Sequence, residues 1–550
     1  MTAPVTTPRQ TDASRSGGVL TGTLTLAGFM LRRDRIRIPL WLLGLTGATL
    51  GTIASLADLY QTAEERQTIA ATMGSPAAVA MTGINHAPED YTYGVMMGHQ
   101  MLWFTAILVG LMSILLVVRH TRLEEATGRA ELVRAGVVGR HASTAAAVLV
   151  VVGANLVLAV LLALSLGTSG YEGVTWEGSW LYGAAHAAVG LVFTGVAVVT
   201  VQVTEHSRGA SGMAIAVIGL SYALRAAGDM GEGALSWLSP IGWAQATRVY
   251  ADQRWWPLVL AVVVAALLMA GGVLLSTRRD VGAGLRRPRP GPPTASAFLA
   301  SPFGFAWRLH RASLIGWCAA LFLLGTMYGS ILGDVEQMLS DVEGLEDFMA
   351  HLPGVDMTEA FAATITAVLA IIVGIYAALA ALKMRTEESA GRAEPVLATA
   401  LSRAAWVRSH LAVAMLGSAL VLMSGGLGLG VLGAATLEDA SLMPQLLGGA
   451  LSYAPAHWIV IALVVALFGL LPRAIMLVWL LIVYSFVVVY LGGLLQFPAW
   501  MTNLSPFGHV PQLPAEDFQL TPLLVLAVIA GALATAGVTA FRRRDLQSST

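Results

Sequence analysis

The chain carries the segment RLEEATGRAE at residues 122–131 and repeats it as RTEESAGRAE at residues 385–394. Seven of the ten positions are identical between the two copies. Each copy follows one long apolar segment and precedes another, so the same charged, helix-prone connector occurs twice at the same depth of a membrane protein. The repeat therefore predicts a fold built from two copies of one membrane unit.

The composition is that of a membrane protein. Of the 550 residues, 56% are hydrophobic and only 12% are charged, whereas soluble domains carry about 25% charged residues. Apolar segments of roughly 18 to 25 residues are long enough to cross a membrane as helices. Twelve such segments lie near residues 38–57, 100–118, 143–167, 180–204, 211–227, 256–276, 314–333, 360–382, 411–433, 451–471, 475–494 and 521–541. They predict an all-α membrane protein of about twelve transmembrane helices, of which the fifth is the weakest because it is short and ends near Arg225.

Other landmarks recur at spacings of about 263 to 276 residues. The matched pairs are Phe29 and Phe305, Arg32 and Arg308, Arg35 and Arg311, Trp41 and Trp317, Tyr182 and Tyr453, His186 and His457, LSPIG (238–242) and LSPFG (504–508), and RRD at 278–280 and 543–545. Each half holds six spans, an even number, so both halves enter the membrane in the same direction. They predict two parallel six-helix repeats with a cleft between them.

The composition also divides the chain into four parts. Residues 1–19 are polar and predict a disordered tail. Residues 20–280 and 302–550 are the two six-span halves, each with its charged connector. Residues 281–301 are rich in proline and arginine and predict a cytoplasmic linker. Segments 20–37 and 298–311 mix apolar residues with arginines, as expected of interfacial helices.

The distribution of positive charge sets the expected orientation. With the N-terminus in the cytoplasm, all but four of the 32 basic residues lie on the inner side; the exceptions are Arg66, Arg225, Arg248 and Arg254. The positive-inside bias then places both termini in the cytoplasm. An acidic outer face that includes Asp334, Glu336, Asp341, Glu343, Glu346 and Asp347 follows from the same orientation. The one cysteine, Cys318, lies inside a span and permits no intramolecular disulfide.

The connectors are the first candidate site. A solvated loop with weak internal ion pairs would explain the charges. The match between copies, in spans that otherwise diverge, instead indicates a docking surface used twice. The candidate residues for docking are Arg122, Glu124, Glu125, Gly128, Arg129, Glu131, Arg385, Glu387, Glu388, Gly391, Arg392 and Glu394.

Polar residues in or next to the spans are candidates for a substrate path or an outer gate. His186 and His457 occupy equivalent positions near the outer ends of the fourth and tenth spans, although a packed, hydrogen-bonded histidine would also explain each. The other candidates are Asn155, Ser239, Pro240, Ser505 and Pro506. The two serine–proline pairs are expected to begin or kink a short outer helix. No catalytic triad and no metal-spaced set of ligands is recognisable.

The doubled connector, the doubled LSP-x-G motif and the RRD that ends each half resemble the permease subunits of ABC exporters of the type-two export class. The closest likeness is to the fused, duplicated actinobacterial permeases of the polyketide antibiotic and multidrug exporter family. It covers residues 20–546. The resemblance implies that segments 124–135 and 387–398 are coupling helices, which seat on a separate ATPase. The copies differ after the motif, where Leu132 becomes Pro395.

The resemblance implies an export permease in the plasma membrane that moves hydrophobic or amphipathic compounds outward. A Walker-type phosphate loop needs a lysine, and the only lysine, Lys383, follows a leucine rather than a glycine. ATP and Mg²⁺ are therefore expected on a partner, a homodimer of a separate ATPase, and not on this chain; lipid and a small-molecule substrate are the other partners, and nucleic acid is not. A proton-driven twelve-span drug transporter is the alternative, but no carboxylate is evident at mid-span. A membrane enzyme acting on lipid carriers would need a polar cluster that is not evident either.

Overall fold

The computed structural model describes residues 18–546, except 281, 287–290, 292, 335–356 and 492–497. Within this part of the chain the secondary structure is helical, with no strand, and twelve helices are long and apolar enough to span a membrane. The expected all-α membrane fold of about twelve spans is confirmed, and the chain is a multi-pass membrane protein. The expected tail up to residue 17, and the acids of the outer face from Glu336 to Asp347, lie outside the described residues.

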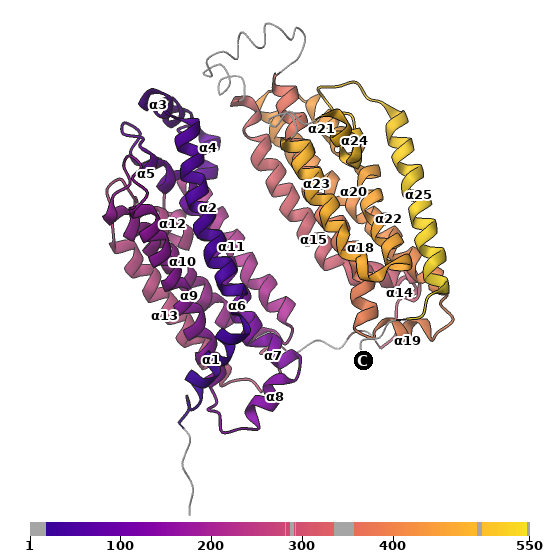
Figure 1. The fold of residues 1–550 in the computed structure, drawn as a ribbon, viewed down its shortest axis with the longest axis horizontal. Helices are drawn as coiled ribbons and strands as arrows, with labels where there is room; N and C mark the ends of the chain where they lie inside the picture. Colours follow the sequence, from indigo (N-terminus) through magenta and orange to yellow (C-terminus); the bar gives the residue numbers. More distant parts are fainter. Residues whose placement is uncertain are drawn as a thin grey trace, which may run out of the picture. The chain divides into compact units, whose positions relative to one another are not determined.

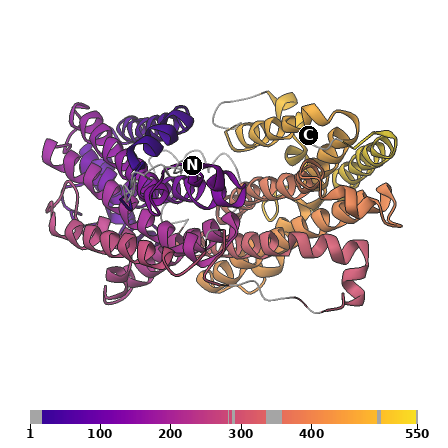
Figure 2. The same cartoon turned by 90° about the horizontal axis from the view of Figure 1, so that it is seen from below.

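The chain divides into two compact units, Met1–Pro290 and Gly291–Thr550. Each is a bundle of helices that run side by side, indigo to magenta in unit 1 and red to yellow in unit 2 (Figures 1 and 2). The spans of unit 1 are α2 (Arg37–Leu59), α5 to α7 (Tyr93–Ala126), α9 (Ala142–Gly167), α10 (Trp176–Val203), α11 (Ser207–Asp229) and α13 (Trp256–Ser276). Its shorter helices are α1 (Thr23–Arg33), α3 (Ala63–Thr72), α4 (Pro76–Thr82), α8 (Arg129–Arg134), η2 (Leu235–Leu238) and α12 (Pro240–Gln245).

Unit 2 repeats this order of spans. They are α15 (Pro302–Gly329), α18 (Met357–Ser389), α20 (Arg403–Thr436), α21 with α22 (Leu442–Ser452, Ala454–Leu470), η4 with α23 (Pro472–Leu477, Val478–Leu491) and α25 (Leu520–Arg543). The shorter helices are α14 (Ala297–Ala300), η3 (Leu332–Asp334), α19 (Ala393–Leu397), α24 (Ala499–Leu504) and η5 (Pro506–His509). In Figure 1, α7 and α8 lie at the opposite end of unit 1 from α3 and α4.

The fourth span is the core of unit 1. Helix α10 packs against α6, α9 and α13, and most of its side chains are buried. The equivalent span of unit 2 is interrupted between α21 and α22 at Tyr453. Pro455 follows this break, and the corresponding residue of α10 is Ala184. Because proline lacks the N–H that continues a helix, the difference between these residues explains the interruption.

The interfacial segments also differ between the units. Helix α1 ends at Arg33 and α2 begins at Arg37, whereas residues 302–329 form the single helix α15 after the short α14. The matched sequences place Pro39 of α2 opposite Ile315 of α15. The proline ring disfavours helix over the residues just before it, so α1 is separate from α2, whereas residues 302–311 continue directly into the first span of unit 2. The position of these segments at the membrane interface stays a prediction.

The weakest predicted span forms a complete helix, α11, over Ser207–Asp229. Arg225 is fully buried in it. Its guanidinium lies 3.5 Å from Asp229, donates a hydrogen bond of 2.7 Å to the carbonyl of Met81 in α4, and stacks on the ring of Tyr222. A buried arginine is tolerated when it is paired in this way, so the charge fixes α4 to the bundle instead of ending the span.

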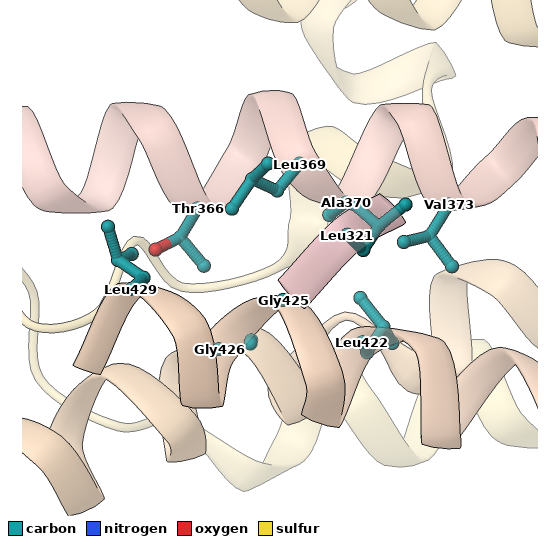
Figure 3. Close-up of a pocket in the computed structure, with 10 residues that line it drawn as sticks. Leu321, Thr366, Leu369, Ala370, Val373, Leu422, Gly425, Gly426 and Leu429 are labelled. Atoms are coloured by element: carbon teal, nitrogen blue, oxygen red, sulfur yellow. The ribbon is translucent and has the colours of Figure 1, made fainter. Parts of the chain in front are cut away.

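Glycines, including those of the run at residues 425–430, bring α15 and α20 close together. A Cβ added at Gly428 would overlap the carbonyl oxygen of Phe322, and one at Gly325 would overlap that of Gly425. Side chains of α15, α18 and α20 surround the apolar cavity that remains beside the run, labelled in Figure 3. Its volume is about 10 Å³, so it is a packing defect and not a substrate chamber.

We predict that Gly428→Ala lowers the stability of unit 2 by about 1–3 kcal/mol, because the added methyl group must separate two packed backbones. The measurement is the apparent melting temperature of the full chain in detergent. Gly316→Ala is the matched control, since nothing lies within 4 Å of its added Cβ. Equal melting temperatures for the two variants would contradict close packing of α15 and α20.

Candidate coupling surface

A glycine divides each connector into two short segments. Gly128 has φ 73° and separates α7 (Arg122–Ala126) from α8, and Gly391 has φ 69° and separates the end of α18 from α19. Positive φ strongly favours glycine and commonly ends a helix. The two matched glycines thus turn the chain out of the second span of each unit and begin a second short helix.

The second glutamate of each connector is held in a buried ion pair. Arg279 donates two hydrogen bonds of 2.9 Å to the carboxylate of Glu125, and Arg122 donates another to it. In unit 2, Arg544 donates a bond of 2.6 Å to Glu388. The side chains of Glu125 and Glu388 are only 10% and 2% exposed. These glutamates are therefore structural anchors with little surface left for a partner protein.

The arginines of these pairs come from the second doubled motif, the RRD at the end of each half. Arg279 follows α13, and Arg544 follows α25. The guanidinium of Arg544 also lies over the rings of Phe468 and Phe541, 4.9 Å and 5.3 Å from their centroids. Cation–π contacts of this kind are stronger in desolvated sites. The connector motif thus supplies the glutamate and the RRD motif the arginine of one ion pair, which joins the connector to the last span of its own unit.

Arg122 extends this anchor in unit 1. It is fully buried and donates hydrogen bonds to the carbonyl oxygens of Thr204, at 2.6 Å, and Ala283, at 2.8 Å. The backbone N–H of Leu285 in turn donates to the carbonyl of Gln202. The first residues of the expected linker therefore run along the end of α10, and the first connector contacts both.

The first glutamate of each connector has different partners in the two units. Glu124 accepts a hydrogen bond from Arg33 of α1. Glu387 instead lies 3.1 Å from Lys383 and accepts bonds of 2.7 Å and 3.1 Å from Arg392. The Glu387 carboxylate, through these hydrogen bonds, raises the pKa of Arg392. Glu124 thus bonds the first connector to α1, whereas Glu387 is bonded to its own connector and to the preceding turn of α18.

The residues after each glycine form the exposed face of the connector. In unit 1 they include Arg129, Glu131 and Leu132, whose side chain is 78% exposed. In unit 2 they include Arg392, Glu394 and Pro395. Leu132 lies in segment 124–135, which the resemblance implies is a coupling helix, but it is not among the docking residues expected from the sequence. Its position after a charged turn was the signal that it belongs to the surface.

The two candidate gate histidines are buried inside their own units. His186 lies 2.6 Å from the hydroxyl of Thr105 and 2.7 Å from the carbonyl oxygen of Tyr182. The ring of His457 lies 2.7 Å from each of the carbonyl oxygens of Tyr453 and Ala370. In each histidine both ring nitrogens lie within hydrogen-bond distance of an oxygen of the same unit. Packing inside the unit therefore explains why a histidine is present at each position, without a substrate.

The other path candidates also form internal bonds. The amide of Asn155 donates a hydrogen bond of 3.0 Å to the hydroxyl of Ser113. The hydroxyls of Ser239 and Ser221 lie 2.8 Å apart. In unit 2, the hydroxyls of Ser505 and Ser485 are also 2.8 Å apart. Pro240 begins α12, and Pro506 begins η5. Each serine caps the short helix that its proline begins. The doubled serine–proline pairs therefore explain local turns, and their role in a gate stays a prediction.

Sequence reasoning missed one buried carboxylate. Asp34 lies between α1 and α2, has no exposed surface, and is 3.0 Å from Arg119 and 2.7 Å from His120. The matched position in unit 2 is His310, which lies 3.2 Å from His410. An acid between arginines in an interfacial segment was the available signal. Among the described residues, no group of three or more His, Cys, Asp or Glu is placed to hold a metal ion.

Comparison with known proteins gives the family. The family model described as the multidrug efflux system permease Rv1217c, C-terminal domain, matches residues 24–275 and 299–542. The chain is also 39% identical over 543 residues to the multidrug efflux system permease protein Rv1217c of Mycobacterium tuberculosis, with 97% of each chain covered. The chain belongs to this family of multidrug efflux permeases.

The family match includes both connectors and both RRD-proximal spans, α13 and α25. A permease is the transport subunit of an efflux system, which is consistent with twelve spans and a pair of charged connectors. The features that the matched segments share in this structure are the connector glycine and the anchored second glutamate. These features separate the anchored part of each connector from its exposed face, which is the candidate coupling surface.

We predict that Glu125→Gln lowers the stability of the chain by about 3–5 kcal/mol, because it leaves Arg122 and Arg279 buried without their carboxylate. The measurement is thermal unfolding of the purified protein. Glu131→Gln, on the exposed face of the same connector, is the control and is expected to change stability by less than about 0.5 kcal/mol. Similar shifts for both variants would show that Glu125 is not an anchor.

Proposed function

We propose that this permease is the membrane subunit of an ATP-driven exporter of the type-two ABC class, in the group of fused actinobacterial multidrug and polyketide antibiotic exporters. Its substrates would be hydrophobic or amphipathic compounds moved out of the cell. The family of multidrug efflux permeases and the full-length relative that carries that name support the substrate class. The doubled connector supports the mode of energy supply.

The observation that carries the proposal is the division of each connector into an anchored part and a free part. Glu125 and Glu388 are buried against the last spans, whereas the residues after Gly128 and Gly391 are exposed. An element that transmits movement must be rigid toward the spans and open toward its partner. The connectors meet both conditions.

The energy source is proposed to be a separate ATPase that holds ATP and Mg²⁺. The only lysine of the chain, Lys383, follows a leucine and lies in α18, 3.1 Å from Glu387 of the second connector. The chain therefore has no lysine for a Walker-type loop. Two connectors fit a dimer of ATPase subunits, one connector to each copy. Differential binding of ATP to the closed dimer would then shift the permease between two conformations.

The path of the movement follows from the anchors. A push on α8 or α19 reaches α13 through Glu125 and Arg279, or α25 through Glu388 and Arg544. Because these pairs are buried, they resist separation better than surface ion pairs would. The last spans are thus the first spans expected to move when the ATPase closes.

We place the connectors and both termini in the cytoplasm and the chain in the plasma membrane, in accord with the positive-inside bias. In Figure 1, α3 lies at the opposite end of unit 1 from α8. In a Cys318→Ala background, Thr68→Cys in α3 is expected to react with a membrane-impermeant maleimide in intact cells. Glu131→Cys is expected to react only after lysis, and the reverse pattern would contradict this orientation.

The docking role is tested with Leu132. Leu132→Asp is expected to lower co-purification of the proposed partner ATPase by roughly tenfold, since burying a carboxylate costs more than losing an apolar contact. Leu132→Met keeps the apolar contact and is the matched control. Full co-purification with the aspartate variant would contradict docking at this connector.

Energy supply is tested with the same complex in inside-out vesicles, as uptake of a fluorescent amphipathic dye. Uptake is expected to require both ATP and the ATPase subunit. Uptake that continues without either of them but collapses with the proton gradient would support the alternative, a proton-driven transporter.

A further inference from the structure

A cavity with polar and charged lining residues lies behind the first connector, within unit 1. It is bounded by α1, the end of α6, α7 and α8, and the first turn of α9, and its volume is about 60 Å³. Its apolar lining residues are Leu26, Phe29, Met30 and Val133. The other lining residues are mostly polar or charged. The cavity therefore has the amphipathic character of the membrane interface at which α1 is expected to lie.

Two arginines and two glutamates line the cavity, and Arg129 is the arginine whose charge is least neutralised. Arg33 and Arg129 both line it, and the carboxylate nearest to Arg129 is Glu124, at 3.9 Å, which already accepts a hydrogen bond from Arg33. Glu125 is neutralised by its own arginines. The matched Arg392 is different, because it is bonded to Glu387 at 2.7 Å and 3.1 Å. The guanidinium of Arg129 thus has N–H groups left to donate to an anion, whereas Arg392 donates two hydrogen bonds to Glu387.

The start of α9 adds further donors. This helix has 26 residues, its N-cap residue His141 makes no side-chain capping bond, and Ser143 and Thr144 of its first turn line the cavity. The free N–H groups at the start of a long helix favour bound anions. His120 also lines the cavity; its side chain is only 2% exposed, its Nε2 lies 2.7 Å from Asp34 and, in the part of the chain described, its Nδ1 has no hydrogen-bond partner. Because Nε2 faces a carboxylate, Nδ1 donates to an anion only when the imidazole is protonated.

We propose that this cavity binds the phosphate of an anionic phospholipid from the leaflet that α1 contacts. A water molecule needs roughly 10–15 Å³ of such volume, so a cavity of about 60 Å³ admits a headgroup but not an acyl chain. The chain would lie along α1, where Leu24 and Phe29 are exposed. A soluble phosphate would accept hydrogen bonds from the same donors, but it has no apolar part to contact Leu24 and Phe29.

The bound lipid would link the interfacial helix to the connector. Its phosphate would contact Arg129 on one side and the first turn of α9 on the other, next to the bond between Arg33 and Glu124. The inference does not depend on an ATPase partner or on transport. It concerns only unit 1, because the corresponding arginine of unit 2 is held by Glu387.

Native mass spectrometry of the full chain, purified in neutral detergent with added phosphatidylglycerol or phosphatidylcholine, tests this site. The wild-type chain is expected to retain phosphatidylglycerol in preference. Arg129→Gln is expected to lower its retention roughly tenfold, as for the loss of one charge-assisted hydrogen bond. Arg392→Gln is the matched control, since the two arginines are 53% and 55% exposed at the same motif position, and it is expected to retain phosphatidylglycerol as the wild-type chain does.

A second variant separates binding from folding. Ser143→Asp places a carboxylate in the first turn of α9, which favours the helix but repels a phosphate, so it is expected to lose the lipid at an unchanged melting temperature. Four results would overturn the proposal: lipid retained in both cavity variants, equal losses for Arg129→Gln and Arg392→Gln, equal retention of the two lipids, or stabilisation by millimolar inorganic phosphate that equals that by phosphatidylglycerol. The last result would assign the cavity to a soluble anion.

Discussion

The structure of each unit depends on one buried ion pair, which joins the second glutamate of the connector to an arginine that follows the last span. Glu125 pairs with Arg279, and Glu388 pairs with Arg544. Charges in and next to a membrane are costly unless they are paired, and a pair that loses one member leaves an uncompensated charge. This constraint gives a physical reason why both motifs occur twice, since each supplies the opposite charge that the other needs.

The pair also determines what the rest of the connector can do. Because the glutamate is used as an anchor, the proposed docking face consists of residues on the far side of the glycine. Those residues are not the same in the two units: Leu132 is replaced by Pro395, and Arg129 is loosely paired while Arg392 is bonded twice. The proposed ATPase dimer would therefore meet two different surfaces, one that carries Leu132 and is linked to α1, and one that carries Pro395 and whose arginine is bonded within its own connector.

Hydropathy was sufficient to predict the spans, because length and apolarity are local properties. Prolines were also readable in principle: Pro39 and Pro455 each break a helix that is continuous in the other unit. The ion pairs were not, because Glu125 and Arg279 are 154 residues apart in sequence and the repeat shows only that both motifs recur. For His186 and His457, the sequence favours a packed histidine, and the repeat leaves a gate open as the second interpretation. Their partners, a threonine hydroxyl and backbone carbonyls, have no signature in sequence, and this is why the internal bonds could not be foreseen.

The most direct test of the anchor is a double-mutant cycle on Glu388 and Arg544. Stability is measured by thermal unfolding for Glu388→Gln, Arg544→Gln and the double variant, in the full chain in detergent. If the two side chains form the interaction on which unit 2 depends, the coupling free energy is expected to be at least about 1.5 kcal/mol, in the upper part of the range for residues in contact. A coupling near zero, with additive losses, would show that the connector and the last span are held together by something else.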